Sequence, residues 1–446
     1  MATPSMRNLQ NADRRHHLHP FTDHGSLHER GTHILLEGDG VWLTDQSGQR
    51  LLDGLAGLWC VNVGYGSERI AEAVAAQLRR LPYYHSFFNS TNQPAIRLAE
   101  RLAELVPSPL SHAVFSNSGS EANETALKIV RALQHLRGRP EKVKIVSRDY
   151  AYHGVTLGTT SLTGLPACRD PFDLPLPGFL YAPAPYTWGA STALAPEAYG
   201  KWCIEQTRGL IEREDPNTVA AIFAEPVQGA GGVIIPPPGY LCALRDLARE
   251  YDLFFVADEV ITAFGRLGAW FASSLWELEP DIMTLAKGLT SGYLPMGATL
   301  VSEEISDELV CGGYFAHGFT YSGHPTCAAA ALANLDEIEE RGLVERVRDD
   351  VGPYFEERLA SLADHPAVGE VRGLGLIGAV ELQAKTVEAG GLPLGARVTE
   401  LVREEGAIVR GIRDLVALAP PLVVARDEID FLIAALCRAL DRLEAA

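Results

Sequence analysis

The sequence predicts an α/β protein with a large domain built on a mainly parallel, doubly wound sheet and a smaller α+β domain built from both termini. Strand and helix signals alternate from about residue 113 to residue 330, which is typical of parallel sheets with helical crossovers. Beyond residue 330, strands and helices mix without that alternation. We therefore expect residues 67–330 to form the large domain, and residues 1–66 and 331–446 to form the small one.

The composition is ordinary for a soluble globular protein: 446 residues, of which 47% are hydrophobic and 21% are charged. A net charge of −19 disfavours nucleic acid and anionic membranes as partners. Seven cysteines are scattered singly, and the N-terminus lacks the apolar stretch of a secretion signal. We therefore expect a cytoplasmic protein with reduced thiols.

Histidines crowd the N-terminal arm, at His16, His17, His19, His24 and His28. Their spacing matches no standard set of metal ligands. We therefore favour a mobile polar arm without a metal, and a metal site is the alternative.

Residues 33–63 read as a small antiparallel unit, because turn clusters separate its β-rich runs. It ends in a Gly-flanked loop that carries Trp59, and an isolated tryptophan usually packs in a core. Helices are predicted from Ser67 to about Leu81 and from Pro94 to about Leu105.

The alternating region contains short apolar runs that end in polar or Gly residues, as buried parallel strands do. The predicted strands are 113–117, 142–147, 220–226, 253–257 and 282–286, and the predicted helices are 118–133, 240–251 and 325–340. In the small domain we expect strands in 368–382, 406–411 and 415–420, and a last helix from about 427.

One motif in the small domain imitates a dinucleotide-binding fingerprint. Gly373, Gly375 and Gly378 fit G-x-G-x-x-G, but they run into a strand-like segment rather than a helix. Glu381 is also too near to contact a ribose. We interpret the motif as a turn.

An aspartate and a lysine follow two of the predicted strands. Asp258 ends the run 253–257 and Lys287 ends the run 282–286, so both should emerge at the ligand-binding edge of the sheet. Two interpretations are open at this point. The pair is either a structural ion pair, or a pyridoxal phosphate (PLP) site with a Schiff-base lysine and an aspartate facing the pyridinium nitrogen.

Further groups at strand and helix ends favour the second interpretation. Ser118-Gly119-Ser120 precedes a helix and would suit a phosphate, although Ser118 with Glu121 is also an ordinary capping box. Tyr152 would stack on a flat ring, Glu225 ends a strand, and Thr320 lies in a Gly-rich loop. Each signal is weak alone, but together they predict a PLP site.

The motifs SNSGSEAN, YHG, AEPVQGAGGV, VADEVITAFGR, LAKGLTSGYLPMGA and GFTYSGHP together resemble class III aminotransferases of PLP fold type I. The resemblance extends over nearly the whole chain, and the branch most resembled is that of the omega-amino acid or amine:pyruvate transaminases.

The resemblance implies that Lys287 forms the Schiff base, that Asp258 keeps the pyridine nitrogen protonated, and that Glu225 holds the region of Asp258 and the ring edge. It implies a homodimer with shared active sites, in which the partner subunit supplies Thr320. The implied cofactor contacts are Ser118, Gly119, Ser120, Tyr152, His153, Glu225, Asp258, Val260, Lys287 and Thr320. The implied substrate contacts are Phe21, Trp59, Phe87, Tyr152 and Arg410, with Phe87 reaching across the dimer and Arg413 a solvated turn residue.

Three departures from the relatives that use ornithine, acetylornithine or 4-aminobutyrate narrow the substrate. Val155 stands where those relatives carry a carboxylate-binding Arg, Ala230 where they carry a Glu, and Ile261 where Gln is frequent. These apolar residues imply an apolar amine pocket.

The implied reaction moves an amino group from an amine or omega-amino acid to an oxo acid, for which we expect pyruvate, with ping-pong kinetics. Lys287 would act as general base and acid in the proton transfer. The nearest alternative is a PLP-dependent aminomutase or decarboxylase on the same fold. A nicotinamide-dependent oxidoreductase built on the Gly373 motif and a non-catalytic binding protein are more distant alternatives.

Overall fold

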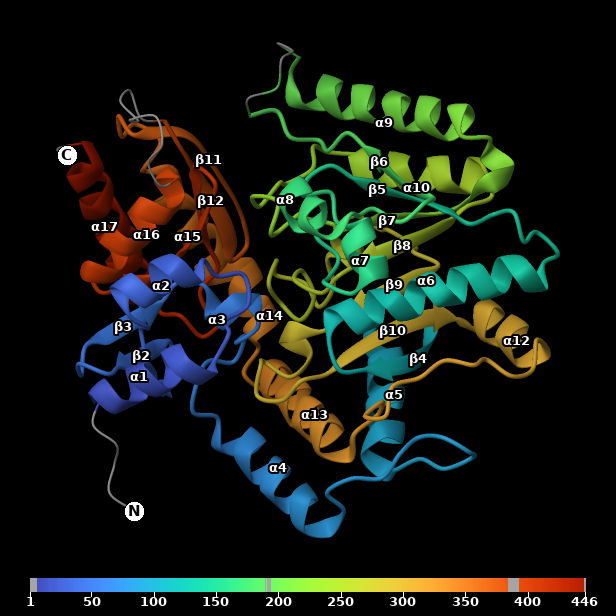
Figure 1. The fold of residues 1–446 in the computed structure, drawn as a ribbon, viewed down its shortest axis with the longest axis horizontal. Coiled ribbons are helices and arrows are strands. Elements are labelled where there is room, and N and C mark those ends of the chain that lie inside the picture. The colour runs from blue at the N-terminus through green and yellow to red at the C-terminus, as the bar shows by residue number, and fades with distance from the viewer. Residues whose placement is uncertain (1–5, 189, 191–193, 384–392, 445–446) are drawn as a thin grey trace.

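A seven-stranded sheet organises the larger lobe of the computed structural model, which describes residues 6–188, 190, 194–383 and 393–444 (Figure 1). Its strand order is β4 (Leu110–Ser116), β10 (Gly297–Ser302), β9 (Ile282–Leu285), β8 (Phe254–Asp258), β7 (Val219–Ala224), β5 (Lys144–Arg148) and β6 (Phe179–Ala182). All neighbours from β9 to β6 are parallel, whereas β10 is antiparallel to both β9 and β4. The predicted mainly parallel sheet is confirmed, although β6 and β10 were not among the predicted strands.

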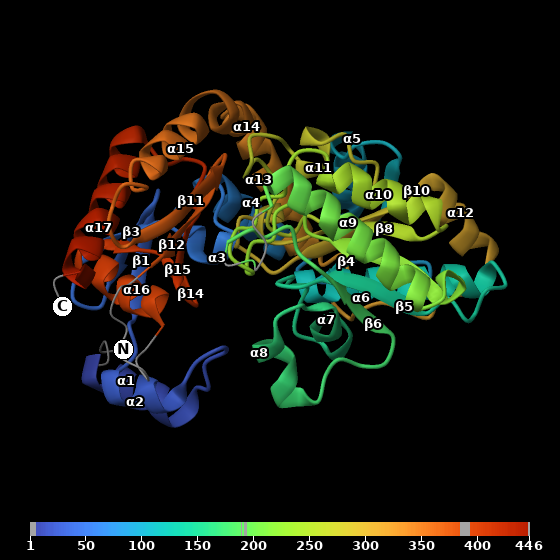
Figure 2. The same cartoon turned by 90° about the horizontal axis from the view of Figure 1, so that it is seen from above.

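The central strands β7, β8 and β9 are buried on both faces, which is why they are almost wholly apolar. In β7, Ile222 and Ala224 pack with helices α9 (Pro196–Arg213) and α10 (Tyr240–Glu250). The alternate residues Ala221 and Phe223 pack with α6 (Gly119–Leu136) on the other face. Figure 2 shows α9 and α10 on one side of the strands and α6 on the other.

The remaining helices of the larger lobe pack around this sheet. They are α4 (Glu68–Arg80), α5 (Gln93–Leu105), α7 (Leu157–Leu162), α8 (Pro166–Arg169), α11 (Ala272–Leu275), α12 (Glu303–Cys311) and α13 (Pro325–Glu340). None of the helices that the structure describes has the length and hydropathy that crossing a membrane requires.

The smaller lobe combines both ends of the chain. One of its two sheets has the strand order β1 (Leu35–Asp39), β2 (Trp42–Asp45), β3 (Arg50–Asp53) and β13 (Ala407–Ile408). The other sheet has the strand order β11 (Val368–Leu374), β12 (Ile377–Leu382), β15 (Leu415–Leu418) and β14 (Arg410–Ile412). The parallel pairing of β13 with β3 joins the N-terminal meander to the C-terminal segment. The helices here are α3 (Ala56–Trp59), α14 (Leu343–Arg346), α15 (Gly352–Ala360), α16 (Leu394–Glu404) and α17 (Arg426–Glu444).

The G-x-G-x-x-G motif of Gly373, Gly375 and Gly378 lies in the hairpin formed by β11 and β12. Gly375 has φ 58°, and a Cβ atom there would lie 2.7 Å from the Cα atom of Leu267. These glycines therefore serve a tight turn packed against backbone, as predicted.

The N-terminal arm, predicted to be mobile, is folded into two helices, α1 (Met6–His16) and α2 (His24–Arg30). Asp23 caps α2, because its carboxylate accepts hydrogen bonds from the backbone N–H groups of Gly25 and Ser26. Local capping thus gives the arm a defined conformation that the histidine spacing did not indicate.

Candidate active site

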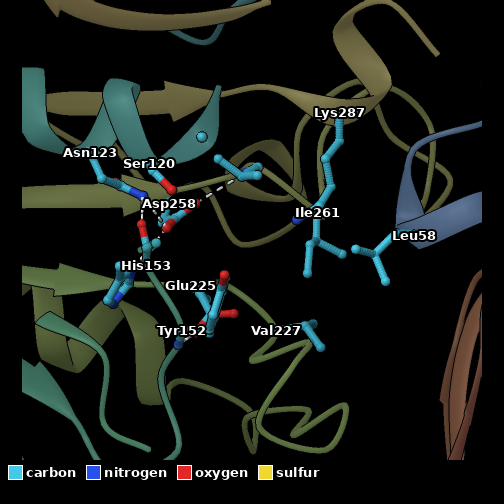
Figure 3. A pocket seen from close by; sticks show the side chains of 13 residues that line it. Leu58, Ser120, Asn123, Tyr152, His153, Glu225, Val227, Asp258, Ile261 and Lys287 are labelled. Atoms are coloured by element: carbon cyan, nitrogen blue, oxygen red, sulfur yellow. Dashed lines mark hydrogen bonds and ion pairs between the residues drawn. The ribbon is translucent and has the colours of Figure 1, made fainter. Parts of the chain in front are cut away.

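A cavity of about 200 Å³ lies beyond the carboxyl ends of the parallel strands, where open α/β sheets bind ligands (Figure 3). It is lined by Leu58, Gly119, Ser120, Asn123, Tyr152, His153, Gly154, Glu225, Val227, Asp258, Val260, Ile261 and Lys287. The predicted site residues outside this lining are Phe21, Trp59, Phe87, Ser118, Thr320 and Arg410.

Lys287 follows β9 and has φ 44°, a left-handed conformation that non-Gly residues adopt only where the surroundings enforce it. Its Nζ atom makes no hydrogen bond or ion pair with the part of the chain that the structure describes. Burial lowers the pKa of this amine, and the nearby carboxylates of Asp258 and Glu225 only partly oppose the shift. A lysine of this kind is available as a neutral nucleophile and base.

Asp258 ends β8 and is held from three sides. Its Oδ2 atom accepts hydrogen bonds from Asn123 Nδ2 and His153 Nδ1, both at 2.7 Å, and its Oδ1 atom accepts one from the backbone N–H of Val260 at 3.1 Å. Because a carboxylate only accepts, His153 must carry its proton on Nδ1. Figure 3 shows these three side chains joined by hydrogen bonds. The orientation of the carboxylate is therefore fixed before any ligand binds.

Two residues of this network, Asn123 and Thr284, were missed by the sequence analysis. Thr284 Oγ1 donates to Asn123 Oδ1 at 2.9 Å, and Asn123 Nδ2 also donates to the carbonyl of His153 at 2.9 Å. The register places Thr284 directly beside Asp258 in the sheet. A polar residue within the apolar run 282–286 was the available signal, but only the strand register shows what it contacts.

Thr284→Val is expected to lower kcat/KM about 5-fold, because the loss of one hydrogen bond of about 1 kcal/mol loosens the side chain that orients Asp258. Thr299→Val is the matched control. Thr299 faces Thr284 in the sheet and donates to the carbonyl of Ala122 on α6, and it has no side-chain hydrogen bond to Asn123 or Asp258 among the described residues. The control should lose thermal stability without that kinetic loss, and equal falls in kcat/KM would contradict the role of Thr284.

Glu225 is buried and makes different contacts from those predicted. Its Oε1 atom accepts from the backbone N–H of Tyr152 at 3.0 Å, and its Oε2 atom accepts from that of Gly229 at 3.1 Å. Glu225 has no hydrogen bond to Asp258 among the described residues, although both line the cavity, so its role in holding the region of Asp258 and the ring edge stays a prediction. Glu225 fixes the Tyr152 backbone and the turn after β7. Burial raises the pKa of Glu225 to about 7.

The N-terminus of α6 borders the cavity through Gly119 and Ser120. A Cβ atom on Gly119 would lie 2.9 Å from Val260 Cγ1, so only glycine allows this close approach. Ser118 lies outside the cavity and caps the helix, accepting from the N–H of Glu121 at 3.2 Å. The free N–H groups of this helix end can bind a phosphate.

Three of the predicted substrate contacts, Phe21, Trp59 and Arg410, lie outside the cavity lining. The Arg410 guanidinium stacks on the ring of Trp59 at 4.7 Å, and Trp59 is fully buried while Leu58 lines the cavity instead. Phe21 lies 6.4 Å from the Tyr152 ring, measured between ring centroids, and its side chain is 75% exposed.

Arg413, predicted to be a solvated turn residue, is exposed but also makes specific contacts. It donates to the carbonyl of Gly231 at 2.8 Å and stacks on Tyr150 at 4.8 Å. The guanidinium of Arg413 is therefore bonded to the turn that follows Glu225.

Comparison with known sequences gives one family. The family described as aminotransferase class-III matches residues 27–440. The chain is 43% identical over 443 residues to a putrescine–pyruvate aminotransferase of Pseudomonas aeruginosa, which covers 99% of this chain and 97% of that protein. It is 41% identical over 437 residues to the mitochondrial gamma aminobutyrate transaminase 1 of Solanum lycopersicum, covering 96% and 85%.

Solved structures agree with the sequence comparison. A thermostable (S)-enantioselective omega-transaminase from Thermomicrobium roseum superposes with a TM-score of 0.94 at 43% identity, covering 99% of this chain and 100% of that one. The omega-transaminase from Pseudomonas jessenii in complex with PMP superposes with a TM-score of 0.93 at 40% identity, covering 97% and 98%.

Proposed function

Because the chain belongs to the class III aminotransferases, we propose that it moves an amino group from an amine or omega-amino acid to pyruvate. Members of this family use PLP, and the mainly parallel sheet belongs to the fold type I architecture of its structural neighbours. The similarity to a putrescine–pyruvate aminotransferase supports pyruvate as the acceptor.

The residues around the cavity fit PLP. Lys287 offers a partly buried amine that would react with the aldehyde, and Asp258 has an oriented carboxylate that would hold the pyridine nitrogen. Tyr152 and Val260 line the cavity where they would contact the two ring faces, and the α6 N-terminus at Ser120 would hold the phosphate. When bound, the cofactor supplies an electron sink for the carbanion formed at the substrate carbon.

The side chains then have separable tasks. Lys287, whose pKa is lowered by burial, would take a proton from the substrate carbon as general base and then deliver it to the carbon of the bound cofactor as general acid. Asp258 would hold the ring nitrogen of the bound cofactor, and its hydrogen bonds from Asn123 and His153 fix the orientation of its carboxyl group. Glu225 holds the Tyr152 backbone so that the aromatic ring stays at the cavity wall.

The proposal that an oxo acid such as pyruvate is the amino-group acceptor rests on the unpaired charge of Arg410. Its guanidinium is half-buried and has no ion pair or hydrogen bond to any described residue. The guanidinium lies 4.7 Å from the ring centre of Trp59, which directly follows Leu58 of the cavity lining in the sequence, and burial lowers the pKa of Arg410. An unpaired buried cation is costly, and a substrate carboxylate would relieve that cost.

The rest of the substrate side is apolar. Leu58, Val227 and Ile261 line the cavity, and no described acidic residue contacts Arg410. Arg410 can therefore swing away when an apolar amine occupies the same place. This arrangement supports amines without a carboxylate as donors alongside omega-amino acids.

The proposed reaction is tested with holoenzyme, pyruvate and a donor panel of putrescine, β-alanine and 1-phenylethylamine. We expect alanine and the matching carbonyl product to form in equal amounts. Product formation without any oxo acid would identify an aminomutase or decarboxylase instead.

Arg410→Ala is expected to raise the KM for pyruvate and β-alanine about 10-fold or more, since a charge-assisted pair with the carboxylate is lost. The half-reaction with 1-phenylethylamine, followed by cofactor absorbance, should change little. Arg413→Ala is the matched control, because Arg413 already bonds to Gly231 and should leave both substrates unaffected. Equal losses on both kinds of substrate in Arg410→Ala would contradict its role as a mobile carboxylate clamp.

The proposal includes a homodimer with shared sites in the cytoplasm. Thr320 and Phe87 are predicted site residues that do not line the cavity of their own chain, so a partner subunit would supply them. Large apolar side chains nearby are exposed, with Phe88 at 84% and Tyr314 at 89%. Sedimentation velocity tests the dimer.

The cysteines are all free thiols, which supports a reducing compartment.

A further inference from the structure

The N-terminal arm contains a cluster of potential metal ligands far from the cofactor residues in sequence. Asp13 and His17 lie one helical turn apart at the end of α1, and His19 folds back onto the same carboxylate. Asp13 Oδ1 lies 3.1 Å from His17 Nδ1 and 2.9 Å from His19 Nε2. The three ligand atoms all lie within 4.8 Å of one another.

We propose that Asp13, His17 and His19 form a binding site for a divalent transition metal such as Zn²⁺. Carboxylate oxygen and imidazole nitrogen are ligands that such ions prefer. In a tetrahedral site with metal–ligand distances of about 2.1 Å, neighbouring ligand atoms lie roughly 3.4 Å apart. The separations of 2.9 and 3.1 Å from the Asp13 oxygen are a few tenths of an ångström shorter than this spacing, and all three ligand atoms lie within 4.8 Å of one another, so the ligands must move slightly apart to admit the ion.

The surroundings support such a site. Thr32 Oγ1 donates to Asp13 Oδ2, which fixes the carboxylate as an outer hydrogen bond does in metal sites. The backbone N–H of His19 donates to His24 Nε2 at 3.0 Å, so the segment between the two helices is tied at its start. The His17 side chain is 62% exposed and leaves a route for the ion and a position for water, whereas Asp13 is only 17% exposed.

The position of the cluster links it to the active site. The metal would join the end of α1 to the segment that leads directly to Phe21, the residue whose ring lies 6.4 Å from the Tyr152 ring. An occupied site would therefore restrict the movement of Phe21 at the cavity mouth. Neither the cofactor residues nor the proposed substrate contacts participate in binding the ion, so the site stands independently of the proposed reaction.

The test uses tag-free holoenzyme that has been treated with a chelator and dialysed. Zn²⁺ binding is measured by titration calorimetry for the wild type, Asp13→Asn, His19→Gln and the matched control His28→Gln. His28 is another arm histidine, on α2, outside the cluster. Far-UV circular dichroism and cofactor absorbance verify that each variant is folded. Trypsin cleavage after the exposed residues Arg14 and Arg15 reports on the arm directly.

We expect one Zn²⁺ per chain in the wild type and in His28→Gln, with affinity at least about 10-fold weaker in Asp13→Asn and His19→Gln. Zn²⁺ should slow trypsin cleavage of the arm in the wild type but not in His19→Gln. Equal affinities in the wild type and His19→Gln would overturn the proposal. The proposal would also be overturned if the wild type bound no Zn²⁺, or if Zn²⁺ left the rate of trypsin cleavage in the wild type unchanged.

Discussion

Lys287→Ala is expected to abolish amino transfer while leaving the protein folded. The substitution removes both the covalent anchor of the cofactor and the base that moves the substrate proton. No other lysine lines the cavity, so nothing among the described residues can replace it. The loss is measured as single-turnover amino transfer from 1-phenylethylamine to the bound cofactor.

Lys142 provides a matched control, because it is also a buried lysine whose pKa is lowered by burial. Its Nζ atom donates to the carbonyl of Asp252 at 2.7 Å, remote from the cavity lining. Lys142→Met should retain amino transfer. Borohydride reduction of the wild type, followed by peptide mapping, should label Lys287 and leave Lys142 unlabelled. A label on any other lysine would refute the assignment.

Asp258→Asn is expected to reduce kcat by about 10³-fold or more, which corresponds to roughly 4 kcal/mol of transition-state stabilisation. The change keeps the size of the side chain but removes the negative charge that faces the pyridine nitrogen. Asn also keeps only one oxygen acceptor, so its NH2 group meets either the donors of Asn123 and His153 at the Oδ2 position or the backbone N–H of Val260 at the Oδ1 position. The rate and the cofactor absorbance spectrum measure the two effects.

Asp281→Asn is the control for this substitution. Asp281 precedes β9 and accepts from the backbone N–H of Phe255 at 2.7 Å, near the start of β8 rather than at its ligand-binding end. Its replacement should lower stability modestly and leave the cofactor spectrum unchanged. Turnover near that of the wild type in Asp258→Asn would show that another group faces the nitrogen.

Much of the fold and the centre of the site follow from local patterns. The short apolar runs around β7, β8 and β9 predicted buried parallel strands, because both faces of such a sheet are covered by helices. Asp258 and Lys287 were found because polar residues directly after such strands must emerge at one edge. Ser118, expected to bind phosphate or to cap, is the cap of α6, and the neighbouring Gly119 and Ser120 border the cavity.

The contacts of individual side chains could not be predicted in this way. Leu58 lines the cavity rather than Trp59 because the loop carries unusual backbone angles, with φ 66° at Gly57 and φ 58° at Trp59. Such backbone angles depend on the surrounding structure, and no periodic pattern of hydrophobic residues predicts them. The hydrogen bond that Glu225 accepts from the backbone N–H of Tyr152 likewise depends on the tertiary structure and could not be predicted from the sequence.

The amino-acid sequence alone therefore determined the fold class, the family resemblance and the residues that end the strands, because these depend on short-range hydrophobic patterns and motifs. Only the tertiary structure decided how residues distant in sequence meet. Thr284 lies beside Asp258 because of strand register, and Asn123 reaches both from a helix packed on that sheet. Arg410 lies over Trp59 without an ion pair to any residue that the structure describes, since β14 of the small lobe brings it there. Hydrogen bonds and ion pairs act over a few ångströms, so packing rather than composition selects the partners.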